Sequence, residues 1–148
     1  NAILRHKVNR AINTDEVAEP NSFAITASIT AFEKGGKWLE ELKSYIESNK
    51  QMAHAYIKTY LPELHVTPSE ATYLLWIDCS HVCKNSLELV EFIRSTTGLY
   101  LSSGEEYGKN AKSFIRMNIA CPQERLNDGL KRLRQGIGNY KKGSENYE

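Results

Sequence analysis

The sequence predicts an α+β fold in which a small, largely antiparallel sheet carries helices on one face and follows a long helix. Two observations lead to this prediction. Apolar residues recur at helical spacing through the first sixty positions, whereas after Pro62 short apolar runs and alternation indicate strands. Helical spacing then returns twice, which gives the order helix, long helix, strand, helix, strand, strand, helix.

Composition describes an ordinary globular chain. It has 148 residues, 41% of them hydrophobic and 25% charged, with a net charge of +1. So small a net charge favours neither nucleic acid, nor a membrane surface, nor a polyanionic substrate. The apolar run at residues 73–77 is too short to cross a bilayer, and we expect a cytoplasmic protein. An odd set of three cysteines, Cys79, Cys83 and Cys121, is typical of reduced thiols rather than of a disulfide framework.

A first helix is expected from Ala2 to Ile12. Leu4, Val8 and Ile12 already follow helical spacing, and Asn1 is not a start methionine. The pattern therefore predicts that the chain begins inside an element, as a piece of a longer protein would.

A second, jointed helix should follow the polar turn at residues 13–16. Pro20 stops regular structure, and Asn21 or Ser22 can cap the helix that comes next. Gly35-Gly36 interrupts its apolar stripe, which then continues to the stop at Pro62. The part after the glycines, about twenty-five residues long, would measure about 37 Å, and such a rod often joins two domains.

Strands are expected at residues 65–67 and 72–78, where branched and aromatic residues gather. Asn85-Ser86-Leu87-Glu88 has the form of a capping box before a helix, and Gly98 is suited to end that helix. We expect a further strand at residues 99–101.

The last strand is expected at residues 114–120, after a loop at residues 102–112. Its residues alternate, with Ile115, Met117 and Ile119 on one face and Phe114, Arg116 and Asn118 on the other. One face of this strand should therefore meet something polar. Pro122 suits the first position of a last helix, which should end near Gly136 or Gly138, with a frayed tail from Lys141.

Arg116 is the strongest candidate for a binding residue. Its planar guanidinium can hold a carboxylate through two parallel hydrogen bonds, and a strand positions it more rigidly than a loop would. The structural alternative is an edge-strand arginine in an internal salt bridge.

No metal site is predicted. The four histidines are scattered, and Cys79 with Cys83 forms a lone C-x3-C pair. Cys121 has no histidine partner at a recognisable spacing, which favours a structural or capping role. Ser103-Gly104 and Tyr107-Gly108 could form an anion-binding turn, although such pairs are usually only turns.

Four segments together resemble the last third of cystathionine beta-lyase-like enzymes of the aminotransferase class I/II superfamily, which depend on pyridoxal phosphate. They occur in the family's order and approximate spacing, and the resemblance covers nearly the whole chain. The segments are Glu19-Pro20-Asn21-Ser22-Phe23-Ala24, Glu70-Ala71-Thr72-Tyr73-Leu74-Leu75-Trp76-Ile77-Asp78, Ser103-Gly104-Glu105-Glu106-Tyr107-Gly108 and Phe114-Ile115-Arg116-Met117-Asn118-Ile119-Ala120-Cys121-Pro122.

The resemblance implies that Arg116 binds the α-carboxylate of an amino-acid substrate such as cystathionine or a cysteine derivative, and that Tyr107 is a substrate-binding neighbour. It implies a homodimeric parent in which Asn21 and Ser22 lie near the partner's site. Residues 1–35 would end the large cofactor domain, residues 36–61 would form the linking helix, and residues 62–148 would form the small domain that closes over substrate.

The resemblance also implies that the Schiff-base lysine and the phosphate-binding loop lie upstream of Asn1. Lys109 and Lys112 do not stand in the family's S-x-x-K context. We therefore expect no catalytic residue on this chain, no cofactor bound to it and no catalysis by it alone.

The parent is expected to cleave a C–S bond or to transfer an amino group, since both reactions need the same carboxylate anchor. Two further hypotheses stay open. The chain could be a self-sufficient α+β binding module without chemistry. It could also bind RNA through its last helix, which carries Lys131, Arg132, Arg134, Lys141 and Lys142, although a solvated helix face explains this basic run better.

Overall fold

The computed structural model describes residues 1–14 and 20–145, which form two compact units, Asn1–Leu42 and Lys43–Glu148. The boundary between the units falls inside one helix. The predicted polar turn at residues 13–16 and the predicted motif residue Glu19 extend into residues 15–19, outside the described part of the chain.

The first unit is helical. It contains α1 (Ala2–Thr14), α2 (Ala24–Lys34) and the first turns of α3 (Gly36–Tyr60). Asn21 turns the chain into α2, because its Oδ1 accepts a hydrogen bond from the backbone N–H of Phe23 at 3.0 Å. The predicted interruption at the paired glycines is confirmed. A Cβ on Gly35 would run into the carbonyl oxygen of Ala31, so only glycine fits between α2 and α3.

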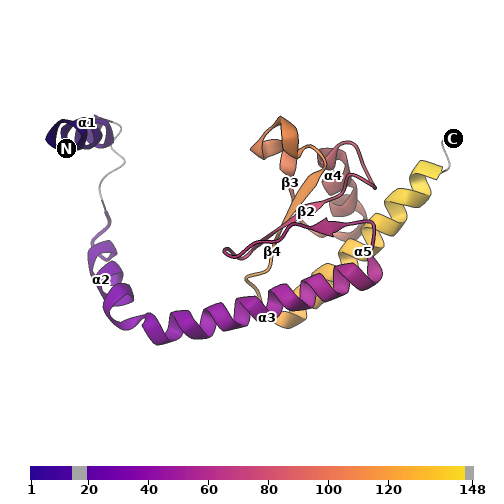
Figure 1. The fold of residues 1–148 in the computed structure, drawn as a ribbon, viewed down its shortest axis with the longest axis horizontal. Helices are drawn as coiled ribbons and strands as arrows, with labels where there is room; N and C mark the ends of the chain where they lie inside the picture. The colour runs from indigo at the N-terminus through magenta and orange to yellow at the C-terminus, as the bar shows by residue number, and fades with distance from the viewer. Residues whose placement is uncertain (15–19, 146–148) are drawn as a thin grey trace. The chain divides into compact units, whose positions relative to one another are not determined.

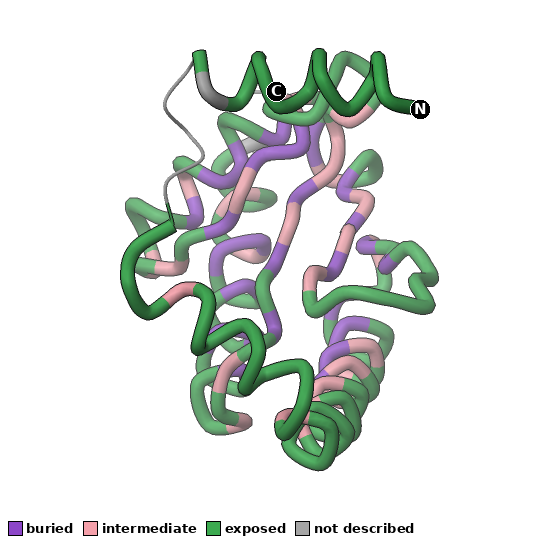
Figure 2. Tube along the Cα trace, turned by 90° about the vertical axis from the view of Figure 1, so that its left-hand side faces the viewer, coloured by how far each residue is buried: buried purple, intermediate pink, exposed green. Residues whose placement is uncertain are grey.

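The large apolar side chains of α1 and α2 are exposed. Ile25, Ile29 and Phe32 of α2 expose 63%, 52% and 93% of their surface, and α2 has no buried residue. Figure 2 shows α1 and α2 as exposed throughout almost their whole length. Among the described residues of this unit, the apolar stripes that predict these helices therefore do not pack into a core.

The second unit is built on a four-stranded sheet of order β1-β2-β4-β3 (Figure 1), in which every pairing is antiparallel. The strands are β1 (His65–Val66), β2 (Leu74–Asp78), β3 (Ser102–Ser103) and β4 (Phe114–Asn118). The predicted α+β class with an antiparallel sheet is confirmed.

One face of the sheet forms the core with α4 (Ser86–Thr97) and α5 (Gln123–Glu145). Leu75 and Ile77 of β2 and Ile115 and Met117 of β4 are each at most 5% exposed. Because side chains alternate along a strand, the residues between them point to the opposite face. Among the described residues of this unit, α4 and α5 thus pack on one face of the sheet, as predicted for the fold class, and we call the opposite face the helix-free face.

The second half of α3 packs on the same core through Ala53 and Ile57, which are buried. Hydrogen bonds from Asn49 connect this half of α3 to the segment between β4 and α5. Its side-chain nitrogen donates to the carbonyl oxygens of Ile119 at 2.8 Å and Cys121 at 2.9 Å.

The predicted capping of α4 is confirmed at both ends. Asn85 Oδ1 accepts from the backbone N–H of Leu87 at 2.9 Å, and its amide nitrogen donates to Glu88 at 3.4 Å. Gly98 takes the left-handed conformation, with φ of 73°, that ends the helix.

The strand predicted at residues 99–101 is wrong in position. Residues 99–101 have no regular secondary structure and bury Leu101, and the chain pairs with β4 only at Ser102 and Ser103, which lie opposite Arg116 and Ile115. The apolar character of this segment comes from packing rather than from strand pairing.

The predicted end of the last helix near Gly136 or Gly138 is also wrong, because α5 continues to Glu145. A Cβ on Gly136 would approach Ile93 of α4 to 2.8 Å. This glycine lets two helices pack closely and does not end one of them. The tail predicted to fray from Lys141 is helical as far as the structure describes it.

Three predicted strands are shorter than expected. β1 ends at Val66 rather than at Thr67. β2 starts at Leu74 rather than Thr72, whose φ of 73° breaks the extended conformation. β4 ends at Asn118, whose Oδ1 accepts a hydrogen bond from the backbone N–H of Ala120 at 2.8 Å and turns the chain.

Among the helices of the described residues, none is long and apolar enough to cross a membrane.

Candidate functional site

The candidate site lies on the helix-free face of the sheet. Trp76 of β2, Arg116 of β4 and Ser102 of β3 stand side by side, since Arg116 is paired with the other two in the sheet register. Arg116 is partly buried and lies on an inner strand. Three strands thus fix the position of one arginine.

Arg116 is held from two sides. Its Nη2 donates a hydrogen bond to Ser102 Oγ at 3.1 Å, and its guanidinium carbon lies 4.9 Å from the centre of the Tyr107 ring. Within residues 1–14 and 20–145 it makes no ion pair with a carboxylate. Arg116 therefore has neither feature of the structural alternative, since it lies on an inner strand and makes no salt bridge within that part of the chain.

Tyr107 is brought to Arg116 by a 3-10 turn, η1 (Gly104–Tyr107). Ser103 caps this turn, because its Oγ accepts from the backbone N–H of Glu105 at 3.2 Å and lies 2.8 Å from Ser86 Oγ in the core. A Cβ on Gly104 would run into the carbonyl oxygens of Ala111 and Phe114. The Ser103-Gly104 pair, a possible anion-binding turn in the sequence, therefore builds the turn itself.

Two further aromatic residues complete the surroundings of Tyr107. The ring of Trp76 meets the Tyr107 ring edge to face, with 5.6 Å between centres and 81° between planes. Trp76 also stacks on Phe114 at 5.5 Å and 12°. Sequence reasoning did not assign Trp76, Phe114 or Ser102 to the site. The strand register would have been the signal, but it depends on which residues of two distant strands pair.

The other two predicted site residues are part of the first unit. Asn21 and Ser22 belong to the Asn1–Leu42 unit, where both are exposed. The structure brings Tyr107 and Arg116 together and leaves the role of Asn21 and Ser22 as a prediction.

The cysteines do not form a metal site. Cys79 and Cys83 are free and buried, and no group of three or more metal-ligating side chains occurs among the described residues. Burial raises the pKa of the Cys79 thiol, and it raises that of Cys83 to about 11. Such thiols remain protonated at neutral pH and are poor ligands and nucleophiles.

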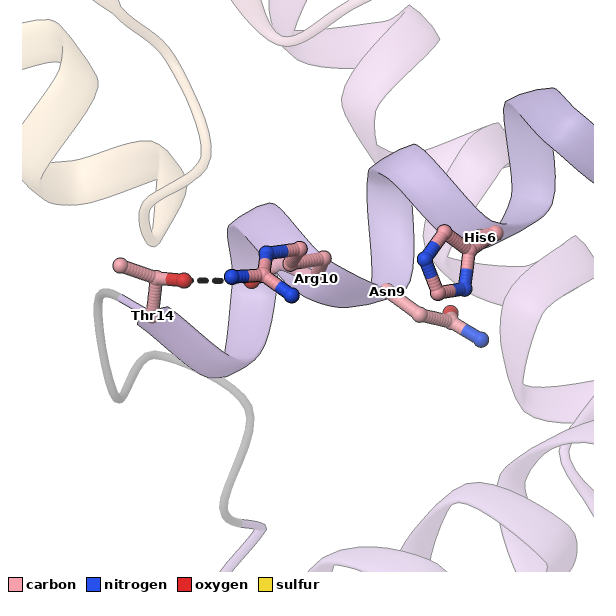
Figure 3. Close-up of a pocket in the computed structure, with 4 residues that line it drawn as sticks. All are labelled: His6, Asn9, Arg10 and Thr14. Atoms are coloured by element: carbon pink, nitrogen blue, oxygen red, sulfur yellow. Dashed lines mark hydrogen bonds between the residues drawn. The ribbon is translucent and has the colours of Figure 1, made fainter.

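A shallow depression on α1 has no features of a binding site either (Figure 3). His6, Asn9, Arg10 and Thr14 line one side of this single helix, and all four are exposed. Thr14 Oγ1 donates a hydrogen bond to the carbonyl oxygen of Arg10 at 2.8 Å, a contact within the helix itself.

The basic residues of α5 are largely engaged in internal contacts. Arg132 pairs with Asp128 at 2.7 Å and donates to the last turn of α4 at the carbonyl oxygen of Thr97. Arg134 lies over the ring of Tyr60, and Lys141 pairs with Glu63. These contacts favour a structural role for the basic run over RNA binding.

Neither lysine beside the Tyr107 turn has the surroundings of a Schiff-base lysine. Lys109 and Lys112 are both exposed, and Lys112 pairs with Glu105 at 3.6 Å. A Schiff-base lysine needs a desolvated pocket. A guanidinium in the surroundings of Arg116 is able to bind an anion such as a carboxylate.

Known proteins resemble this chain in sequence and in structure. No protein-family model matches it. Cystathionine beta-lyase PatB of Bacillus subtilis (strain 168) is 34% identical over 135 residues, which are 91% of this chain and 35% of that protein. Protein MalY of Escherichia coli (strain K12) is 28% identical over 83% of this chain and 32% of its own length.

Among solved structures, the PLP-bound C-S lyase from Staphylococcus hominis is 28% identical and superimposes with a TM-score of 0.76, over 86% of this chain and 34% of that one. The PLP-bound cystalysin of Treponema denticola has the same fold, with a TM-score of 0.75 over 80% of this chain and 30% of that one, at 24% identity. The chain spans about a third of the length of the curated relatives it matches.

Proposed function

This chain is homologous to about one third of the cystathionine beta-lyase-like proteins of the aminotransferase class I/II superfamily, as their C-terminal portion, and from this premise we propose that its Arg116 binds the α-carboxylate of an amino-acid substrate. The whole protein would be a pyridoxal-phosphate-dependent C–S lyase acting on cystathionine or a cysteine derivative. When bound, the cofactor would supply the electron sink for the reaction.

The observation that carries the proposal is the state of the Arg116 guanidinium. It is held by Ser102 and Tyr107 on the helix-free face, and within the described residues no carboxylate neutralises it. A partly buried cation without an internal counter-charge is suited to an external carboxylate. One end of its fork is taken by Ser102, and the remaining N–H groups can face a ligand.

Aminotransfer is the second candidate reaction, since a carboxylate anchor would serve it equally well. The products separate the two. C–S lysis of cystathionine releases pyruvate, ammonia and a thiol, whereas transamination releases the keto acid of the intact substrate.

The remaining parts of the proposal concern the parent protein. Residues 1–35 would complete its large domain, residues 36–61 would form the linking helix, and residues 62–148 would close over the substrate. The apolar residues that α1 and α2 expose in this chain would then be covered by the rest of the large domain. In a homodimer, Asn21 and Ser22 would lie near the partner's site.

The proposal is tested with Arg116→Lys in the full-length protein. The substitution keeps the charge and removes the planar fork, so kcat/KM should fall by about tenfold to a hundredfold, equivalent to about 1.5 to 3 kcal/mol for a charged hydrogen-bonded pair. Steady-state kinetics with pyruvate detection measure this fall. An unchanged kcat/KM would mean that Arg116 does not anchor the substrate.

Two controls make the result specific. Arg125→Lys changes an exposed arginine of α5 and should leave kcat/KM as it is. An amine analogue of the substrate that lacks the α-carboxylate should bind the Arg116→Lys protein as tightly as the unmodified protein.

A further inference from the structure

Tyr107 touches Arg116 with the face of its ring. The guanidinium carbon lies 4.9 Å from the ring centre, a distance at which a cation is attracted to the electron-rich face of an aromatic ring. This contact involves the ring and not the phenol hydroxyl. A direct hydrogen bond from Tyr107 to a substrate would use the hydroxyl instead.

The Tyr107 ring is itself fixed by two neighbours. Phe114 stacks on Trp76, and Trp76 meets Tyr107 edge to face. These three rings come from β4, β2 and η1, so each is attached to a different part of the backbone. Edge-to-face and offset-stacked pairs hold defined ring orientations. Although Tyr107 is half exposed, its orientation is thus set by the sheet.

Ser102 holds the guanidinium at another point. Its Oγ accepts from Arg116 Nη2 at 3.1 Å, and it stands directly opposite Arg116 in the β3–β4 register. One group therefore binds an end of the fork, and the ring of the other lies next to the guanidinium carbon. Together they restrain a long side chain that would otherwise lose more rotamer entropy when it binds a ligand.

We propose that Tyr107 and Ser102 are positioning residues that hold the Arg116 guanidinium ready for the substrate carboxylate, and that Tyr107 acts through its ring rather than through its hydroxyl. The inference rests on the proposed function of Arg116. It assigns to Tyr107 an effect on substrate affinity that passes through Arg116 and needs no contact between Tyr107 and the substrate.

The test uses the full-length protein with Tyr107→Leu and Tyr107→Phe. A cation–ring contact at a half-exposed site is worth about 0.5 to 1 kcal/mol, so Tyr107→Leu should raise KM by about twofold to fivefold, with kcat little changed. Tyr107→Phe restores the ring and should recover the affinity lost in Tyr107→Leu. If Tyr107→Phe loses as much affinity as Tyr107→Leu, the hydroxyl is the active group and the inference is overturned.

A matched control exists on the same unit. Arg94 lies over the ring of Tyr100 at 5.2 Å, away from the helix-free face site, and Tyr100→Leu should leave KM unchanged. Ser102→Ala provides a second variant should Tyr107→Leu fail to fold. It should raise KM in the same direction, and an unchanged KM would remove Ser102 from the assignment.

Coupling to Arg116 separates positioning from a general structural effect. If Tyr107 acts through Arg116, Tyr107→Leu should add little to the loss already caused by Arg116→Lys, whereas full additivity would overturn the inference. The dissociation constant of an unreactive carboxylate-bearing analogue, measured by calorimetry, should rise by the same factor as KM. If Arg116→Lys by itself left kcat/KM unchanged, the proposed function of Arg116 would be overturned instead.

Discussion

Single residues in this chain owe their roles to the groups that surround them. Arg116 and Arg132 are both arginines of the second unit, yet Arg132 is paired with Asp128, whereas Arg116 has a hydroxyl and an aromatic ring as neighbours. Asn49 is fully buried and donates to two carbonyl oxygens. The sequence lists these residues but not their neighbours, and the neighbours determine the function.

The buried thiols predict a loss of stability in alkaline solution. The pKa of Cys83 is raised from 9.0 to about 11 in the folded chain, chiefly by desolvation, and that of Cys79 is raised for the same reason. The unfolded chain then releases protons first, so the stability that protonated Cys83 contributes is complete below pH 9 and is lost progressively from pH 9 to about 11.

Urea unfolding at pH 8 and at pH 10, followed by circular dichroism, measures this loss. Cys83→Ala should make the pH dependence shallower without abolishing it, because Cys79 and Tyr140 also have raised pKa values. An equally steep dependence in Cys83→Ala would show that this thiol is not the source.

At the scale of secondary structure elements, local signals and packing signals have to be separated. The capping box at Asn85 and the left-handed Gly98 are local, and both predict the ends of α4 correctly. Gly136 gives a similar local signal for a helix end, yet α5 continues past it. Its missing side chain is required by Ile93 on another helix, and a neighbour from a distant segment cannot be seen in a local pattern.

Gly136 and Gly138 therefore predict opposite responses to the same substitution. Gly136→Ala should destabilise the chain by about 1 to 3 kcal/mol, because the new methyl group would overlap Ile93. Gly138→Ala has open space around it and should stabilise α5 by up to about 1 kcal/mol. Chemical denaturation of the two variants measures both changes, and similar effects of the two substitutions would contradict the close packing of α4 on α5.

At the scale of the whole chain, its two units differ in what they bury. The Lys43–Glu148 unit encloses a core that extends from Ala53 to Ile137. In the Asn1–Leu42 unit the large apolar residues of α1 and α2 are exposed. Exposed apolar stripes of this kind are typical of surfaces that another part of a protein covers.

The exposed stripe of α2 predicts self-association of this chain in isolation. Replacing Ile29 and Phe32 by lysine should shift the chain towards monomer, because both side chains are mostly exposed and their apolar surface drives association. Analytical ultracentrifugation over a range of concentrations measures the shift. Glu33→Lys, on the same helix, controls for added charge, and equal behaviour of all three proteins would exclude the stripe as the contact.

The sequence by itself determined the fold class, the helices and strands in outline and Arg116 as a candidate, because periodicity, caps and strand alternation are local properties of the chain. It also carried the resemblance to the family to which the chain proves homologous. Only the tertiary structure decided that Arg116 lies on an inner strand between Trp76 and Ser102. It also decided that Arg116 makes no ion pair within the described residues. Strand register and helix packing depend on contacts between distant segments, and those contacts exist only in the folded chain.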